Sequence, residues 1–186
     1  MSETGLFGGA FDPPHVGHVA LARSAKERFG LPRLVILVAE RPGHKETHLP
    51  AAERLELARA AFPGDAVRLD PYARTIDLLR SEPFVDPIFI VGADQFASFL
   101  SWKEPDEVLE RARLAVATRP GYPRLQLDAV LEELDQPDRV VFFDIEANPA
   151  ASRDVRALAA DGKSLAGLVP DAVAERIRQH DLYSDH

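Results

Sequence analysis

The stretch that decides the fold reads Gly5-Leu6-Phe7-Gly8-Gly9-Ala10-Phe11-Asp12-Pro13-Pro14-His15-Val16-Gly17-His18. It starts as an apolar strand and ends where a helical pattern begins, so it predicts a strand–loop–helix unit. Gly8 and Gly9 allow an anionic ligand to approach the backbone closely. We expect the first amide groups of the helix to point outward, where the helix dipole favours negative charge. His15 and His18 lie three positions apart, so both imidazoles can face one site and donate to phosphate oxygens.

The same loop has other interpretations. The Gly-x4-Gly-Lys-Ser/Thr spacing of a Walker A loop and the Gly-x-Gly-x-x-Gly fingerprint of dinucleotide-binding proteins are both absent. His15 and His18 could supply half of a zinc site, for which Asp12 is the only local candidate as a further ligand. We expect no zinc, because a structural site takes about four ligands. A plain strand-to-helix turn with surface histidines is the remaining alternative.

Composition bounds the class of protein. The chain has 186 residues, of which 46% are apolar, no cysteine, and a formal net charge of −8. The longest apolar runs are too short to span a bilayer and no signal peptide is visible, so we expect a cytoplasmic protein without membrane contact. The acidic balance and the lack of a basic block argue against a nucleic-acid partner. A small anionic ligand remains compatible with this charge, because a few local cations and amides suffice to bind it.

Apolar runs of strand length alternate with helical patterns. We expect strands at 4–7, 34–38, 66–69, 88–91, 114–117 and 140–145, and helices at 16–29, 51–62, 76–80, 105–111, 125–134, 152–160 and 171–180. Nearly continuous apolar strands are typical of a sheet covered on both faces. The alternation predicts an α/β fold with a doubly wound, mostly parallel sheet, helices on both faces and a C-terminal helical segment. No linker divides residues 1–186, so we expect a single domain with its chemistry in the loops after the strands.

Residues 8–18 resemble the GGTFDPxHxGH signature of bacterial nicotinate-mononucleotide adenylyltransferases, which belong to the Rossmann-like HxGH nucleotidyltransferases. Further segments are similar in order and spacing: Arg41-Pro42-Gly43-His44-Lys45, Thr75-Ile76-Asp77-Leu78-Leu79, Gly92-Ala93-Asp94-Gln95, Trp102-Lys103, Arg119-Pro120-Gly121-Tyr122 and the tail at 161–170 and 181–183. The resemblance covers nearly the whole chain. It implies transfer of AMP from ATP to nicotinate mononucleotide, giving deamido-NAD and pyrophosphate in NAD biosynthesis.

The resemblance also implies roles for individual residues. The implied ATP-binding residues are Gly8, Gly9, Ala10, Phe11, His15, His18, Gly92, Asp94, Ser152 and Arg156, and the implied acceptor-binding residues are Lys45, Thr75, Trp102 and Arg119. The catalytic set is His15, His18, Lys45 and Arg156, which would stabilise charge on the α-phosphate and the leaving pyrophosphate. Mg²⁺ is expected with ATP, held by phosphates and water rather than by the protein. The expected partners are small molecules.

Some of these residues keep a structural interpretation beside the functional one. Lys45 could be a solvated loop lysine, and Asp94 could cap a helix. Trp102 could fill the core, and Arg119 could form only a surface salt bridge.

One segment departs from the family pattern. The family's Ser-Ser-Thr-x-Ile-Arg reads Ala151-Ser152-Arg153-Asp154-Val155-Arg156 here. Ser152 and Arg156 lie four positions apart on one helix face. Arg153 either adds charge near phosphate or points to solvent.

Rival functions share the fold. The chain could act on nicotinamide mononucleotide or phosphopantetheine, could be a cytidylyltransferase, or could be a non-catalytic nucleotide sensor. The Trp102-Lys103 and Arg119-Pro120-Gly121 segments favour the nicotinate enzyme. If backbone amides near Thr75 and Trp102 offer only donors, nicotinate mononucleotide should be preferred over its amide by roughly 10-fold or more, because a buried unpaired donor costs about 1–3 kcal/mol.

Overall fold

The computed structural model describes residues 3–43, 46–119, 121–146 and 148–184. Its strands are β1 (Thr4–Gly9), β2 (Leu34–Ala39), β3 (Ala66–Asp70), β4 (Pro87–Gly92), β5 (Arg113–Thr118) and β6 (Val140–Asp144). Its α-helices are α1 (Val16–Phe29), α2 (Ala51–Ala61), α3 (Thr75–Ser81), α4 (Ala93–Ala97), α5 (Pro105–Arg111), α6 (Arg124–Glu132), α7 (Ser152–Ala160) and α8 (Asp171–Gln179). Two short 3-10 helices lie at Phe99–Ser101 and Pro137–Arg139.

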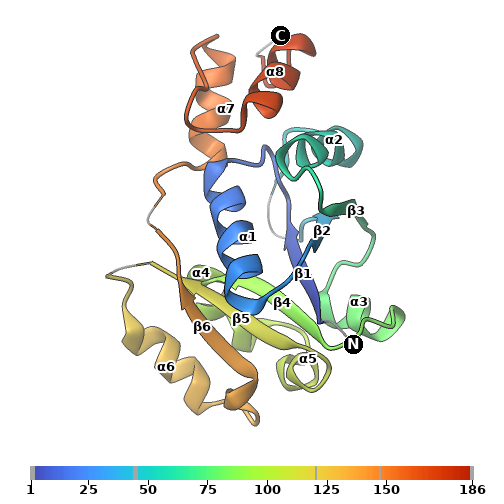
Figure 1. Cartoon of the computed structure of the whole chain (residues 1–186), viewed down its shortest axis with the longest axis vertical. Helices are drawn as coiled ribbons and strands as arrows, with labels where there is room; N and C mark the ends of the chain where they lie inside the picture. Colours follow the sequence, from blue (N-terminus) through green and yellow to red (C-terminus); the bar gives the residue numbers. More distant parts are fainter. Residues whose placement is uncertain (1–2, 44–45, 120, 147, 185–186) are drawn as a thin grey trace.

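The six strands form one sheet in the order β3-β2-β1-β4-β5-β6, and all five neighbouring pairs are parallel. Helices α1, α2, α7 and α8 lie on one face and α3 to α6 on the other (Figure 1). The doubly wound α/β architecture predicted from the sequence is therefore confirmed. From β1 the chain adds strands on one side as far as β3, and from β4 it adds them on the other side. The boundary between β1 and β4 is therefore the topological switch point, where ligands bind in such sheets.

The core is divided by the sheet into two apolar clusters. Neighbouring strand residues alternate between them: Phe7 and Ile36 pack with α1 and α2, whereas Leu6 and Leu37 pack with the helices of the other face. All four side chains are at most 3% exposed. This burial on both faces explains the continuous apolar runs, since side chains on a strand point alternately to opposite faces.

Most predicted boundaries differ from the observed ones by one or two residues. Three short elements were not predicted: α4, a five-residue helix that follows β4 directly, and the two 3-10 helices. These segments are too short to show a helical repeat, so their conformation depends on packing. No helix in the described part of the chain is long and apolar enough to cross a membrane.

Candidate active site

A crevice begins where β1 and β4 separate. Their pairing ends at Phe7 and Ile90, while β1 continues beside β2 through Gly9 and β4 continues beside β5 through Gly92. The carboxyl ends of the two central strands therefore diverge toward opposite sides. The loops that follow them line two cavities at this edge of the sheet.

The larger cavity has a volume of about 520 Å³, within the usual range for a small-molecule site. Its walls include the strand end at Gly8, Gly9 and Ala10, Thr75 at the start of α3, and Trp102 after the first 3-10 helix. The charged side chains of its lining are three cations and two anions: Arg41, Arg74, Lys103, Asp70 and Asp94. The cavity thus offers cationic groups to an anionic ligand, of which Lys103 is also paired with Asp77 outside the lining.

Trp102 is half-buried at the wall of the larger cavity. Its indole packs edge-on against Phe99 at 5.2 Å and Phe89 at 6.3 Å between ring centroids. Beside it, the Lys103 Nζ lies 2.9 Å from a carboxylate oxygen of Asp77, which ties this segment to α3. The tryptophan therefore combines core packing with a position at the cavity. Its backbone amide donates to the Phe99 carbonyl at 2.9 Å, so it is not the open donor that we expected.

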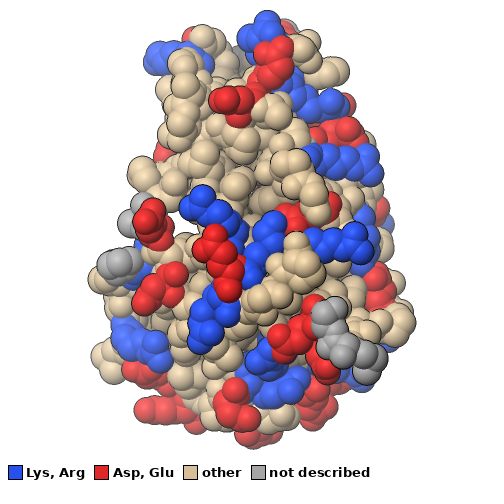
Figure 2. Space-filling model, in the orientation of Figure 1, with Lys and Arg blue, Asp and Glu red and all other residues tan. Residues whose placement is uncertain are grey.

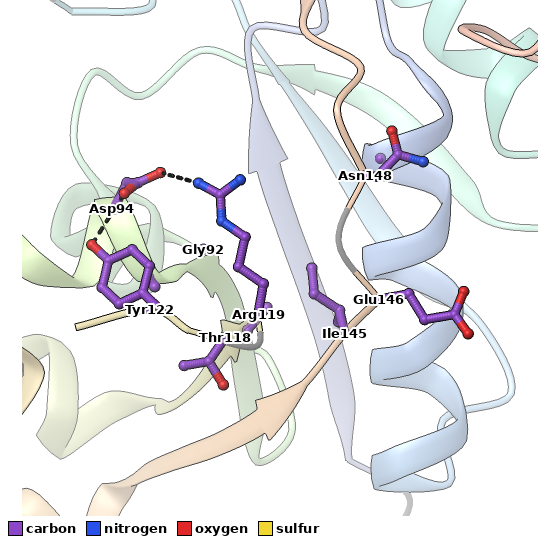
Figure 3. A pocket seen from close by; sticks show the side chains of 11 residues that line it. Gly92, Asp94, Thr118, Arg119, Tyr122, Ile145, Glu146 and Asn148 are labelled. Carbon is purple, nitrogen blue, oxygen red and sulfur yellow. Dashed lines mark hydrogen bonds and ion pairs between the residues drawn. The ribbon is translucent and has the colours of Figure 1, made fainter. Parts of the chain in front are cut away.

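The smaller cavity has a volume of about 190 Å³. Figure 3 shows Asp94, Arg119 and Tyr122 on one side of it, and Ile145 and Glu146 on the other, with α1 behind them.

Asp94 lines both cavities. The hydroxyl group of Tyr122 donates to one carboxylate oxygen at 3.1 Å, and the Arg119 guanidinium lies 3.7 Å from the other (Figure 3). Desolvation and the neighbouring carboxylate raise the pKa of Tyr122, so its hydroxyl stays a donor at neutral pH. The helix cap that we considered for Asp94 is instead Gly92. Asp94 therefore presents a carboxylate at the point where the cavities meet.

The two histidines form the N-terminal cap of α1. His15 is the N-cap residue, and its Nδ1 accepts from the Gly17 amide at 3.1 Å. The Nδ1 of His18 accepts from the His15 amide at 3.2 Å. Because each Nδ1 acts as an acceptor, the proton of each neutral imidazole is on Nε2. Both rings therefore carry their N–H donor on the outer nitrogen, and their centroids lie 3.8 Å apart.

The first amides of α1 are not available to an anion in the way that we expected. The Val16 amide donates to the Leu168 carbonyl at 2.9 Å, and the His18 amide donates to the His15 carbonyl at 2.9 Å. The Gly17 amide is bound by the His15 side chain. The capping box and the C-terminal segment satisfy these amide donors, so the imidazoles rather than the backbone are the groups of this helix start that we consider for an anion.

Burial lowers the pKa of His15 to about 4. The side chain is thus neutral at pH 7 and donates a hydrogen bond without adding charge. The neutral state is also the one that caps the helix, since a protonated Nδ1 cannot accept from the Gly17 amide.

Asp12 joins three segments of the chain. It is 4% exposed, and its carboxylate accepts from the amides of His48 at 2.6 Å and Leu49 at 3.3 Å, and from the Tyr183 hydroxyl at 2.9 Å. These bonds occupy the only residue near the histidines that we considered as a further zinc ligand. Among the described residues, no three or more His, Asp or Glu side chains are grouped closely enough to hold a metal ion.

Arg54 holds the backbone of the same loop and was missed by the sequence analysis. It is 1% exposed and donates to the carbonyls of Ala10 at 2.7 Å, Ala39 at 2.8 Å and Leu49 at 3.1 Å. Its position in an ordinary amphipathic helix offers no signal of this role. An arginine suits it, because one guanidinium carries several donors in a fixed geometry.

Ser152 and Arg156 reach the first loop from α7. The Ser152 hydroxyl donates to the Pro13 carbonyl at 2.9 Å, and Arg156 donates to the Asp12 carbonyl at 2.7 Å. The departure from the family motif therefore keeps the two residues that contact this loop. Arg153 is 86% exposed, lies near Asp154 and points to solvent.

The structure groups the residues that the resemblance implied into three regions. The glycine-rich strand end (Gly8, Gly9, Ala10), Thr75 and Trp102 share the larger cavity, whereas Gly92 and Arg119 share the smaller one. The third region contains His15, His18, Ser152 and Arg156 around residues 12–13, outside both linings. The strand end that the resemblance assigned to ATP therefore lines the same cavity as Thr75 and Trp102, and Arg119 lines the same cavity as Gly92.

Phe11 is 2% exposed and packs edge-on against Phe7 and His18, so its side chain belongs to the core and not to a ligand site. Lys45 lies outside the described residues, as does His44.

Tyr122, Glu146 and Asn148 line the smaller cavity and were not assigned to the site from the sequence. Tyr122 directly follows Arg119-Pro120-Gly121, so its position in that motif could have assigned it to the site. Glu146 and Asn148 lie in an irregular loop after β6, where no repeat or motif distinguishes them.

Figure 2 shows acidic and basic side chains interspersed over one face of the molecule, in keeping with the formal net charge of −8. The cations that line the larger cavity act locally. A few nearby cations suffice to attract a small anion at short range, because solvent screens the more distant acidic groups.

Residues 6–164 match the cytidylyltransferase-like family. Among curated proteins, the chain is 34% identical over 196 residues to a probable nicotinate-nucleotide adenylyltransferase of Rubrobacter xylanophilus, covering 97% of this chain and 92% of that protein. It is 37% identical over 191 residues to the protein of the same name from Thermus thermophilus, covering 96% of this chain and 98% of that protein.

Solved structures show the same fold at low sequence identity. The nicotinic acid mononucleotide adenylyltransferase of Plasmodium falciparum, complexed with NaAD, superimposes with a TM-score of 0.75 at 14% identity, covering 98% of each chain. A putative nicotinate-nucleotide adenylyltransferase from Vibrio parahaemolyticus superimposes with a TM-score of 0.68 at 19% identity, covering 100% of this chain and 98% of that one.

Proposed function

Since the chain belongs to the cytidylyltransferase-like family, among relatives named nicotinate-nucleotide adenylyltransferases, we propose that it transfers AMP from ATP to nicotinate mononucleotide. The products are deamido-NAD and pyrophosphate, as in NAD biosynthesis. The observation that supports this most directly is the pair of cavities that meet at Asp94 beside the capped histidine pair. Because the reaction consumes ATP, we place it in the cytoplasm.

The two cavities suit the two substrates. We assign the adenosine of ATP to the smaller cavity, where Asp94 can accept hydrogen bonds from ribose hydroxyls and Arg119 can contact the nucleotide. We assign the acceptor to the larger cavity, where the Trp102 indole offers a surface for the pyridine ring and Thr75 a hydroxyl donor. The phosphates of both substrates would then meet near the strand end at Gly9.

The reaction needs little proton transfer. A phosphate oxygen of the mononucleotide, already anionic, forms a bond to the α-phosphorus of ATP. The bond from that phosphorus to the bridging oxygen breaks, and pyrophosphate leaves with the electron pair. Catalysis thus rests on alignment and on charge stabilisation. The Nε2–H groups of His15 and His18 would donate to α-phosphate oxygens, while Lys45 and Arg156 would supply positive charge.

Magnesium fits this site as an ion that arrives with ATP. The described residues near the histidines offer no cluster of carboxylates, and Mg²⁺ commonly keeps water ligands and binds substrate phosphates. Bound in this way, it would neutralise charge on the leaving pyrophosphate.

Charge supports the nicotinate acceptor over its amide. The larger cavity has three cationic and two anionic side chains, and Thr75 adds a hydroxyl group. A carboxylate gains from these donors, whereas a carboxamide directs its own N–H groups at some of them. We expect a preference of roughly 10-fold in kcat/KM for the nicotinate form. Equal kcat/KM values for the two mononucleotides would refute this specificity, while the proposed adenylyl transfer would still stand.

The direct test is pyrophosphate release by the purified protein with ATP and Mg²⁺. Nicotinate mononucleotide should support turnover, and phosphopantetheine or replacement of ATP by CTP should not. His18→Ala should lower kcat by roughly 100-fold or more while the fold remains, because one donor to the α-phosphate is lost. Turnover with another acceptor alone would assign a different member of the fold. Binding of ATP without turnover on any acceptor would indicate a nucleotide sensor.

A further inference from the structure

The C-terminal segment folds back onto the loop that precedes the histidines. The hydroxyl group of Tyr183 donates to the Asp12 carboxylate at 2.9 Å, across 171 positions of sequence. Leu182 packs against the core beside α8, and its amide donates to the Ile177 carbonyl at 3.0 Å. Residues 182 and 183 therefore lie at the end of α8, which packs beside α2, and reach the first loop through Asp12 (Figure 1).

Two residues of this segment have positive backbone φ angles, which residues other than glycine rarely adopt. The φ angle is 51° at Asp181 and 68° at Tyr183. Such conformations persist where surrounding contacts over-determine them, and they concentrate at functional sites. The left-handed conformation of Asp181 ends α8, because the following Leu182 amide donates back to the Ile177 carbonyl at 3.0 Å. That of Tyr183 accompanies its hydrogen bond to Asp12.

The Asp12 carboxylate also connects Tyr183 to other parts of the chain through further hydrogen bonds. Its oxygens also accept from the amides of His48 and Leu49, just before α2. Arg54 closes the network, since it donates to the carbonyls of both Leu49 and Ala10. Tyr183 thus completes a buried set of bonds that joins the loop after β1, the segment before α2 and the end of the chain.

This network adjoins the groups that would act in the transfer. Ala10 lines the larger cavity, Arg156 donates to the Asp12 carbonyl, and His15 follows Asp12 by three positions. A shift of Asp12 would therefore displace the strand end and the histidine cap together. Displacement of reacting groups by about 1 Å can cost 100-fold in rate.

We propose that Tyr183 is a positioning residue, whose hydroxyl group acts through the Asp12 carboxylate to hold the loop after β1 in the geometry that adenylyl transfer requires. This inference rests on the proposed function. It concerns the alignment of the phosphates and not the affinity for either substrate, because Tyr183 lines neither cavity.

The test is Tyr183→Phe, which removes one oxygen atom and keeps the ring. We expect kcat to fall about 10-fold, with each KM changed by less than about 2-fold, because the loss acts on alignment. The matched control is Ile177→Val, which removes one buried methylene from α8 in the same C-terminal region. It should lower the melting temperature and leave kcat unchanged.

Each outcome separates the possibilities. An unchanged kcat in Tyr183→Phe would overturn the inference, as would an equal loss of kcat in Ile177→Val. Loss of the cooperative melting transition in Tyr183→Phe would make the hydroxyl a requirement for folding and would also overturn it. Absence of turnover in the unmodified protein would instead refute the proposed function.

Discussion

Acidification should destabilise the native protein through His15, and His15→Asn should remove that part of the pH dependence. Burial lowers the pKa of His15 from 6.5 to about 4. The native state therefore favours the neutral ring, and between these pKa values the unfolded chain binds more protons. The contribution of neutral His15 to the free energy of unfolding is therefore complete above pH 6.5, and it is lost as the pH decreases toward 4. Asparagine does not titrate, and its side-chain oxygen can accept from the Gly17 amide as the imidazole does.

The size of the effect follows from the shift. Each pKa unit corresponds to about 1.4 kcal/mol, so lowering the pH from 7 to 5 would cost about 2 kcal/mol if the whole shift applied. The side chain is only half-buried, and solvent screening reduces this figure. We expect the unmodified protein to lose about 1–2 kcal/mol more than His15→Asn over this interval.

The assay is urea unfolding of both proteins at pH 7, 6 and 5, followed by circular dichroism. The comparison cancels the other titrating groups, which the two proteins share. Parallel stability curves for the two proteins would refute the assigned neutral cap. Greater acid sensitivity in His15→Asn would reverse the sign of the effect and refute it as well.

The remaining predictions concern stability and acceptor binding. Arg54→Met should lower the free energy of unfolding by about 3 kcal/mol because buried carbonyls lose their donors, whereas exposed Arg59→Met in the same helix should change it by less than about 0.5 kcal/mol; equal urea midpoints would contradict this. Gly5→Ala should cost about 1–3 kcal/mol, since its Cβ would lie 2.4 Å from Leu34 Cδ2; an unchanged melting temperature would disprove the clash. Trp102→Ala should raise KM roughly 10-fold for both pyridine mononucleotides in steady-state kinetics, because stacking is lost for either; unaltered KM values would exclude the stacking role.

Much of the fold could be predicted from local patterns. Apolar runs of strand length, the 3.6-residue helical pattern and the turn residues between them identified the six strands and seven of the eight α-helices of the described part of the chain, with α1, α5 and α7 at their observed bounds. The place of His15 and His18 at the start of a helix could likewise be predicted from the sequence of the first loop, because their spacing is a local property. The roles drawn from the family resemblance were a separate source, and periodicity contributed nothing to them.

Tertiary structure decided the partners of those residues. The bonds of Tyr183 to Asp12 and of Arg54 to Ala10 join positions 171 and 44 residues apart, so they depend on how the layers stack on the sheet. The same is true of the cavity walls, where the strand end at Gly9 lies with Trp102, and Arg119 pairs with Asp94. Periodicity and turn chemistry act within a few residues, whereas burial and hydrogen bonding at this edge of the sheet arise only when the loops after β1, β4, β5 and β6 converge there.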